Sequence, residues 1–269
     1  MKTFLVPVDF SDTSKNAARY AAQLASGIQD AQIILYNASD KINSISEGND
    51  GSRKSVSANE LGLLKTELNS LGTTTITFVA EEGPLVSNLE KYLENKHIDL
   101  IIMGITGSSR LTQIFMGTNT LNVIRHVSVP VMIIPPDAKF SSIKNVLLIS
   151  DFKDVANTTP FHEISAALDV FKPNLHIVNV DSEHYIELTE EYKKERAVMV
   201  ERLGKYNPEF SFLRLFDFLD GVNTFVETKN IDAILTVPKK HSFLSALFQV
   251  SHTKKLAYHS HVPIIAVHQ

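Results

Sequence analysis

The sequence contains no cysteine, which excludes disulfide bonds and thiolate metal sites and suits a reducing compartment. It has no excess of basic charge: 26 Lys and Arg stand against 30 Asp and Glu, so no general positive field exists to gather nucleic acid. No apolar run approaches the ~18 residues of a membrane helix, and the run after Met1 is too short for a signal-peptide core. We therefore expect a globular cytoplasmic protein that binds neither nucleic acid nor membrane.

The chain repeats itself. With 269 residues, 43% of them hydrophobic, it can form one large domain or two ordinary ones. Four segments of the first half recur in the same order in the second: FLVPVDFSD (from Phe4) as VLLISDFKD (from Val146), IILYNASD (Ile33) as HIVNVDSE (His176), HIDLIIMG (His97) as NIDAILTV (Asn230), and RHVSVPVMIIP (Arg125) as YHSHVPIIAVH (Tyr258). The last two pairs share an offset of 133 residues. This pattern predicts a duplication, with domains at residues 1–136 and 143–269 and a linker, PPDAKFSS, at residues 135–142.

Each copy alternates short apolar strands with helices. In the first copy we expect a helix over residues 12–26, capped by Ser11 or Asp12 and by Gly27, and a mobile polar loop over residues 40–58. Further helices are expected near 58–71, 85–96 and 114–127, and strands at 3–8, 31–38, 74–80, 98–103 and 129–135. The longest helix of the second copy is expected near 186–203. Nearly continuous apolar strands of this kind indicate a parallel sheet covered on both faces. The predicted fold class is α/β, with two tandem doubly wound domains, each a five-stranded, mainly parallel sheet.

The segment GITGSSRLTQIFMGTNT, residues 104–120, lies between a strand end and a helix start. In open parallel sheets, ligands bind outside the carboxyl ends of the strands. Glycine permits positive φ or a close approach, and N–H groups at a helix start suit phosphate. The segment has neither the P-loop pattern nor the close GxGxxG pattern. On this evidence alone, a phosphate loop and a loop with ordinary capping glycines both remain open.

The spacing of the glycines favours the phosphate loop over a loop with ordinary capping glycines. Gly104, Gly107, Gly117 and Thr118 form G-x2-G-x9-G-T, which resembles the phosphate and ribose motif of the universal stress protein family in its ATP-binding branch. VPVDFSDTSKNAARYA, from Val6, resembles the opening strand and helix of that family, and SVPVMIIPP, from Ser128, resembles its closing strand. The resemblance covers the whole chain as a tandem pair, and it implies the Rossmann-like fold of the adenine nucleotide alpha hydrolases.

The resemblance also implies binding roles. ATP, or ADP or AMP, would be held with Mg²⁺ or Mn²⁺ coordinated through the phosphates. Asp9 would lie against ribose and adenine, and Ala38 would offer its backbone to the adenine. The other implied contacts are Pro7 and Val8 along the same edge, Gly104 and Gly107 near ribose and phosphates, and Gly117, Thr118 and Asn119 on the phosphates. Independently of the resemblance, an acid at a strand's carboxyl end suits a sugar hydroxyl. The alternative for Asp9 is a cap or dipole partner at the helix start, but Ser11 and Asp12 can already serve there, so we favour the ligand role. Arg110 is either a forked phosphate donor or a solvated loop residue.

The second copy departs from the motif. Val237, Lys240 and Val250 stand opposite the three glycines and Ser251 opposite Thr118, while Asp151 persists opposite Asp9. Because a β-branched residue tolerates positive φ badly, we expect the second copy to have lost nucleotide and to act as a packing partner. The closing strands of the two copies are predicted to pair as an intramolecular pseudo-dimer, with a further homodimer possible. His259 and His261 are a metal pair or, as we favour, surface histidines.

The leading functional prediction is an ATP-binding stress-response protein rather than a turnover enzyme. No lysine, general base or nucleophile is placed by a known motif in the glycine segment. One alternative is a scaffold that binds no nucleotide. Another is an ATP-using adenylating enzyme of the related architecture, but those enzymes carry a glycine-rich loop after the first strand, where this chain has VDFSDTS.

Overall fold

A computed structural model describes residues 1–39, 52–72, 74–105, 118–180, 189–213, 218–237 and 262–268. The chain divides into two compact units, Met1–Phe140 (unit 1) and Ser141–Gln269 (unit 2), which are described separately. Within these ranges, no helix is long and apolar enough to cross a membrane. The predicted pairing of the two closing strands stays a prediction.

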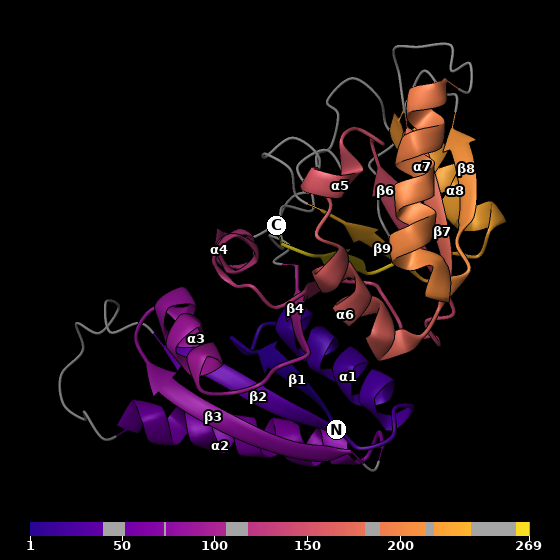
Figure 1. Cartoon of the computed structure of the whole chain (residues 1–269). Helices are drawn as coiled ribbons and strands as arrows, with labels where there is room; N and C mark the ends of the chain where they lie inside the picture. The colour runs from indigo at the N-terminus through magenta and orange to yellow at the C-terminus, as the bar shows by residue number, and fades with distance from the viewer. Residues whose placement is uncertain are drawn as a thin grey trace, which may run out of the picture. The chain divides into compact units, whose positions relative to one another are not determined.

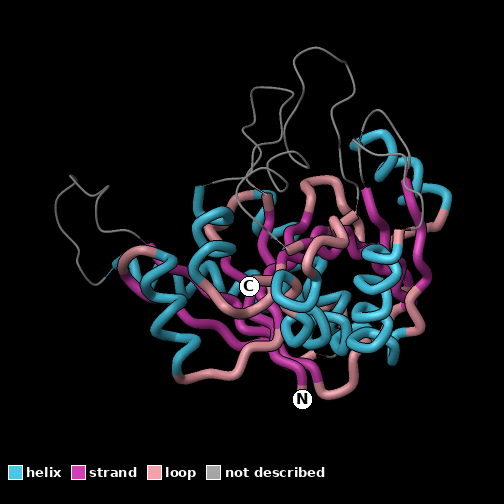
Figure 2. The backbone as a smooth tube through the Cα atoms, turned by 45° about the horizontal axis from the view of Figure 1, so that its top comes forward, coloured by secondary structure: helices cyan, strands magenta, loops and turns pink. Residues whose placement is uncertain are grey.

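Unit 1 is a parallel sheet with helices on both faces (Figures 1 and 2). The described strands lie in the order β3-β2-β1-β4-β5, and every neighbouring pair is parallel. Helices α1 and α2 contact each other on one face, and α3 contacts α4 on the other. The strands are β1 (Lys2–Pro7), β2 (Ala31–Ser39), β3 (Thr75–Glu82), β4 (Leu100–Gly104) and β5 (Val131–Ile134); the helices are α1 (Asp12–Ser26), α2 (Ser52–Asn69), α3 (Leu85–Glu94) and α4 (Thr118–His126).

Unit 2 repeats this order, since its described strands lie as β10-β9-β6-β7-β8, again all parallel. The strands are β6 (Asn145–Ser150), β7 (Asn174–Val180), β8 (Glu209–Leu213), β9 (Ala233–Thr236) and β10 (Ile264–Ala266). The helices are α5 (Val155–Thr158), α6 (Phe161–Phe171), α7 (Glu190–Leu203) and α8 (Phe218–Thr228), with a 3₁₀ turn at Gly204–Tyr206. The predicted α/β fold class is confirmed in both units.

Two local structures recur in both units. Asp99 accepts the N–H of Thr3 at 2.8 Å at the start of β1, and Asp232 accepts the N–H of Asn145 at 2.9 Å at the start of β6. Phe10 and Phe152, which follow the first strand of their units, both have positive φ, 64° and 52°. A bulky side chain rarely adopts that backbone conformation. The two loops therefore share this conformation at the phenylalanine, but they differ at the second aspartate, since Asp154 also has positive φ and Asp12 already belongs to α1.

The helix after this turn differs between the units. In unit 1, α1 is continuous, begins at the cap Ser11 and ends at Gly27, as predicted. In unit 2 the corresponding segment is divided into α5 and α6, with Pro160 at the start of α6. The first N–H of α5, on Val155, donates to Oε2 of Glu195 from α7 at 2.8 Å. The chain's own carboxylate therefore occupies the start of that helix.

Two sequence predictions for unit 1 need correction. The predicted loop over 40–58 ends earlier, because α2 begins at Ser52; residues 40–51 lie outside the described part. The sequence does not reveal the start of α2, because none of its side chains described before Leu61 is buried; Val56, for example, is 55% exposed. In addition, the strand register pairs Val6 with Leu35 and Leu148 with Ile177, which shifts the alignment of IILYNASD with HIVNVDSE by one residue.

The first part of the predicted linker belongs to unit 1. Nδ2 of Asn16, in α1, donates to the carbonyl oxygens of Pro135, Pro136 and Ala138 at 3.2–3.3 Å. The ring of Phe140 packs edge-on against Tyr20 of the same helix, with centroids 5.3 Å apart. Residues 135–140 therefore contact α1 and belong to unit 1.

Candidate functional site

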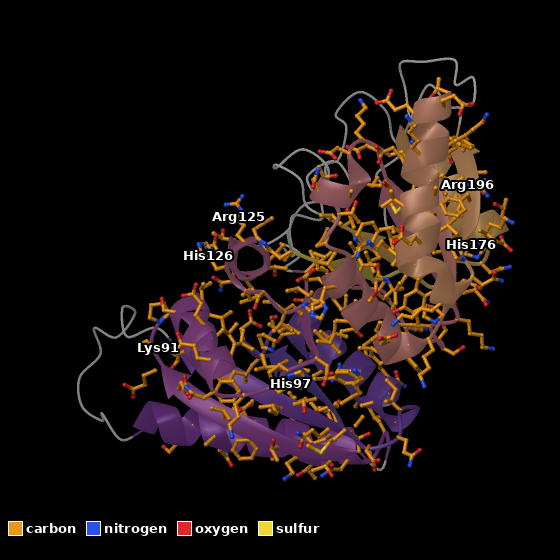
Figure 3. All side chains as sticks on the ribbon, in the orientation of Figure 1. Lys91, His97, Arg125, His126, His176 and Arg196 are labelled. Atoms are coloured by element: carbon orange, nitrogen blue, oxygen red, sulfur yellow. The ribbon has the colours of Figure 1, made fainter. Side chains whose placement is uncertain are left out.

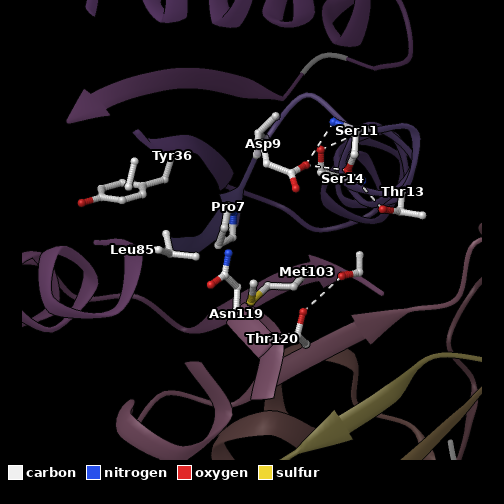
Figure 4. A pocket seen from close by; sticks show the side chains of 13 residues that line it. Pro7, Asp9, Ser11, Thr13, Ser14, Tyr36, Leu85, Met103, Asn119 and Thr120 are labelled. Atoms are coloured by element: carbon white, nitrogen blue, oxygen red, sulfur yellow. Dashed lines mark hydrogen bonds between the residues drawn. The ribbon is translucent and has the colours of Figure 1, made fainter. Parts of the chain in front are cut away.

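A pocket opens at the carboxyl ends of β1, β2 and β4, where the fold class predicts ligands (Figure 4). It encloses about 520 Å³ when the space of its open mouth is included. Its described lining comes from the three strand ends and from the starts of α1, α3 and α4. The lining residues are Pro7, Val8, Asp9, Ser11, Thr13, Ser14, Tyr36, Ala38, Leu85, Met103, Gly104, Asn119 and Thr120.

One side of the pocket is apolar. It is formed by Pro7, Val8, Ala38, Leu85 and Met103, together with Tyr36. The Tyr36 hydroxyl donates to Oε2 of Glu81 at 2.5 Å. Burial and the neighbouring Glu81 carboxylate raise the pKa of this phenol, so it stays protonated. The pocket therefore has an apolar wall on which a planar base could pack.

Asp9 lies at the rim beside the start of α1. Its Oδ1 accepts the N–H of Ser11 at 3.0 Å and the Ser11 hydroxyl at 2.5 Å, and in Figure 4 the second carboxylate oxygen points away from Ser11. Burial raises the pKa of Asp9, but hydrogen bonds from Ser11 and Ser14 outweigh it, and the net pKa lies below the ordinary value. The carboxylate is therefore ionised at neutral pH. Ser11 itself caps α1 by accepting the N–H of Ser14 at 3.3 Å.

Gly104 is required by packing. A Cβ at this position would lie 2.6 Å from the carbonyl carbon of Thr13 and 3.1 Å from the amide nitrogen of Ser14. Backbone atoms cannot move aside as the end of a flexible side chain can, so α1 reaches β4 only because residue 104 is glycine. From the sequence, we expect a ligand to lie close to this glycine. The close neighbour in the structure is α1, although Gly104 also lines the pocket.

The start of α4 forms the third side. Thr118 is the first residue of the helix and is exposed but does not line the pocket, whereas Asn119 and Thr120 do. Figure 4 shows the Asn119 amide pointing toward Pro7. Thr120 donates its hydroxyl to the carbonyl oxygen of Gly104 at 3.4 Å, which ties α4 to the end of β4. Gly107, Gly117 and Arg110 lie outside the described residues.

The equivalent place in unit 2 is built differently. Asp151 accepts the N–H of Lys153 at 3.2 Å, as Asp9 accepts that of Ser11, but Val237 follows β9 where Gly104 ends β4. The ring of Phe152 is buried and stacks on Tyr192, with centroids 5.0 Å apart. The predicted replacements Lys240, Val250 and Ser251 and the pair His259 and His261 lie outside the described residues.

The pocket brings together most, but not all, of the predicted site. Six predicted residues line it: Pro7, Val8, Asp9, Ala38, Gly104 and Asn119. Reasoning from the sequence missed seven lining residues, namely Tyr36, Leu85, Met103, Ser11, Thr13, Ser14 and Thr120. Ser11, Thr13 and Ser14 follow Asp9 closely in the sequence, so the first turn of the helix was a usable signal. Leu85 carried no signal, because nothing in its sequence context places the start of α3 at the pocket.

Comparison with curated proteins finds two relatives in Methanocaldococcus jannaschii. Universal stress protein MJ0531 is 27% identical over 145 residues, which cover 51% of this chain and 84% of that protein. Universal stress protein MJ0577 is 27% identical over 154 residues, which cover 49% of this chain and 94% of that protein.

Among solved structures, a universal stress protein from Archaeoglobus fulgidus aligns with 99% of this chain and 98% of its own, at a TM-score of 0.66 and 17% identity. A protein of unknown function from Pseudomonas aeruginosa aligns with 100% of this chain and 92% of its own, at a TM-score of 0.59 and 12% identity. At such identities these two structures support the fold alone. The model of the universal stress protein family matches residues 1–135, which contain all of the pocket's described lining. With this match over half of its length, the chain belongs to the universal stress protein family, which has a stress-response role.

Proposed function

We propose that unit 1 binds ATP in this pocket and that the protein is an ATP-binding regulator of the stress response. The observation that carries the proposal is that one pocket joins an apolar wall, an ionised carboxylate and the start of a helix. These three features match the three parts of a nucleotide: base, sugar and phosphates.

The adenine would pack on the apolar wall. Tyr36 cannot turn its hydroxyl to the base while that hydroxyl is bonded to Glu81. Polar recognition of the base therefore falls to the backbone of β2, where Ala38 lines the pocket. This agrees with the role that the family resemblance implies for Ala38.

The ribose would lie at Asp9. An ionised carboxylate accepts hydrogen bonds from the two ribose hydroxyls, and acids at the carboxyl end of a strand serve this role in other doubly wound folds. Ser11 holds Oδ1 of Asp9 in place from the protein side. Asp9 thus binds Ser11, the N-cap of α1, through one carboxylate oxygen and also lines the pocket.

The phosphates would lie toward α4. The first N–H groups of a helix have no partner within the helix, and the helix dipole adds partial positive charge there. Thr118 begins α4, and Asn119 projects into the pocket. Gly107 and Gly117 complete the motif in sequence, and Mg²⁺ or Mn²⁺ would be held through the phosphates.

We further propose that the nucleotide is held as a signal and not turned over, and that the protein acts in the cytoplasm. Unit 2 would act without nucleotide. A scaffold that binds no nucleotide is the second candidate, favoured by the departures from the motif in unit 2. The adenylating-enzyme alternative remains disfavoured, because the loop after β1 is VDFSDTS and contains no glycine.

Isothermal titration with Mg-ATP tests the proposal. We expect a stoichiometry near one per chain. Asp9→Asn preserves the acceptor for Ser11 but removes the charge, and should weaken binding about tenfold. Asp151→Asn is the matched control in unit 2 and should leave the affinity unchanged.

Failure to bind ATP would overturn the proposal in favour of the scaffold, and a stoichiometry near two would show that unit 2 also binds. The expected hydrolysis rate is far below the ~1–10³ s⁻¹ of dedicated enzymes. A rate within that range would refute the signal-holding role.

A further inference from the structure

We infer that Asn37 is a positioning residue that keeps the backbone N–H of Ala38 open to the base of the ligand, and so favours adenine over guanine. This inference rests on the proposed function, because it concerns the base end of the same pocket. Asn37 does not line the pocket itself; it acts through the backbone of its neighbour.

The hydrogen bonds between β1 and β2 are interrupted at Val8. The N–H of Val8 still donates to the carbonyl oxygen of Tyr36 at 2.8 Å. In a parallel ladder the next bond would run from the N–H of Ala38 to the carbonyl oxygen of Val8. That oxygen instead accepts Nδ2 of Asn37 at 2.7 Å, and β1 ends at Pro7. Among the described backbone groups, the N–H of Ala38 makes no such bond.

Backbone groups two residues apart in a strand point the same way. Since the carbonyl of Tyr36 points toward β1, the N–H and the carbonyl of Ala38 point to the same side, beyond the residue at which β1 has ended. Ala38 lines the pocket at that point. The pocket thus presents a backbone donor and a backbone acceptor side by side.

The arrangement costs stability. Asn37 is only 5% exposed, and its Oδ1 has no hydrogen-bond partner in the described structure. A buried polar atom without a partner is unfavourable, and a valine of similar size would avoid this cost in a strand. Asn179, at the equivalent place in unit 2, is also buried with an Oδ1 that has no partner in the described structure, so the feature that distinguishes unit 1 is the bond from the Asn37 amide to the carbonyl oxygen of Val8.

Unit 2 shows the ladder without the interruption. By strand register, Ser150 and Asn179 correspond to Val8 and Asn37, and there the pairing continues through Ser150 and Asn179. Asn179 is buried as well, at 4% exposure, but its amide does not bond the carbonyl of Ser150 in the described structure. In unit 1 the pairing of the first two strands therefore ends one residue earlier than in unit 2, because the Asn37 amide donates to the carbonyl oxygen of Val8. Unit 1 is also the unit in which the pocket is described.

A donor beside an acceptor distinguishes the purines. Adenine offers an acceptor at N1 and a donor at its N6 amino group, which match the N–H and the carbonyl of Ala38. Guanine offers a donor at N1 and an acceptor at O6, which would face like groups in both positions. An open Ala38 should therefore bind adenine and reject guanine.

The test compares the wild-type full chain with Asn37→Val, using selective ¹⁵N-alanine labelling and titrations with Mg-ATP and Mg-GTP. In Asn37→Val the Val8 carbonyl loses its side-chain donor and can accept Ala38. We expect exchange of the Ala38 amide with solvent in the free protein to slow at least tenfold. The affinity for ATP should fall about tenfold, the value of one hydrogen bond, while that for GTP stays unchanged. Asn179→Val is the matched control and should change neither measurement for unit 1.

Each outcome decides. Unchanged Ala38 exchange in Asn37→Val, or slowed exchange with an unchanged ratio of ATP to GTP affinity, would overturn the inference. If the wild type binds no ATP, the proposed function fails by itself, whereas the exchange measurement still shows whether Asn37 opens the ladder. Asn37→Thr, which also lacks the amide, replaces Asn37→Val if the latter does not fold, with the same expected results.

Discussion

Replacing Gly104 by alanine should destabilise unit 1, because the added methyl would overlap the backbone of α1. Its carbon would lie 2.6 Å from the carbonyl carbon of Thr13, so either α1 or β4 must shift. Overpacking of this kind costs about 1–3 kcal/mol. The lower entropy of an unfolded chain with alanine in place of glycine returns roughly 0.4–1 kcal/mol. The expected net loss is about 1–2 kcal/mol, a fall in the melting temperature of about 3–8 °C for a unit of this size.

Gly62→Ala is the matched control. Gly62 lies within α2, and apart from the backbone of its own helix and its chain neighbours nothing described lies within 4 Å of an added Cβ. The same chemical change should there stabilise the helix by about 0.5–1 kcal/mol. Scanning calorimetry measures both variants, and hydrogen exchange of peptides from β4 assigns the transition to unit 1. If Gly104→Ala were as stable as the wild type, the argument that α1 requires this glycine would be wrong.

Three further variants probe charge and capping. Burial lowers the pKa of His176 (Figure 3) more than Glu209 raises it, so the native state favours the neutral ring. The contribution of this neutral ring to stability is fully present above pH 6.5 and is lost as the pH falls. The urea midpoint of unit 2 should therefore drop between pH 7 and pH 5, and it should drop less in His176→Leu. Burial raises the pKa of Asp99, but Lys2 and the backbone of β1 lower the pKa by more, so the contribution of the Asp99 carboxylate to stability is present above pH 3.8 and is lost below that pH. Asp99→Asn should therefore cost about 1–2 kcal/mol of stability at pH 7 and little at pH 2. An equal cost at both pH values would contradict this role of Asp99. Ser11→Ala should cost about 0.5–2 kcal/mol of stability through loss of the α1 cap. It should also raise the pKa of the Asp9 carboxyl, which loses a hydrogen bond from Ser11, and NMR titration measures this change. An unchanged pKa of Asp9 would contradict that role of Ser11.

The order of strands and helices could be read from the sequence because strands buried on both faces are nearly continuous apolar runs. LIIM in β4 and VMII in β5 are examples, and all of their side chains are buried. The start of α2 could not be read, because no side chain described from Ser55 to Glu60 is buried, and without an apolar stripe the sequence carries no helical period.

Some residues of the candidate site could be predicted from the sequence and others could not. Asp9 and Gly104 were found because a charge and a glycine interrupt apolar runs at strand ends. Tyr36 and Asn37 were not singled out, because a tyrosine and an asparagine in a strand signal nothing until their partners are known. Those partners, Glu81 and the carbonyl of Val8, lie 45 and 29 residues away along the chain. Contacts over such separations are set by the sheet register, which a single sequence does not show.

The three hydrogen bonds from Asn16 shorten the joint between the two units. With Pro135 to Phe140 held on α1, only residues 141–144 separate the end of unit 1 from Asn145, the first residue of β6. A fully extended chain spans at most about 18 Å from Phe140 to Asn145. The linker can become longer than this only if residues 135–140 detach from α1. Extension of the linker would therefore break contacts of the same helix whose first turn lines the pocket.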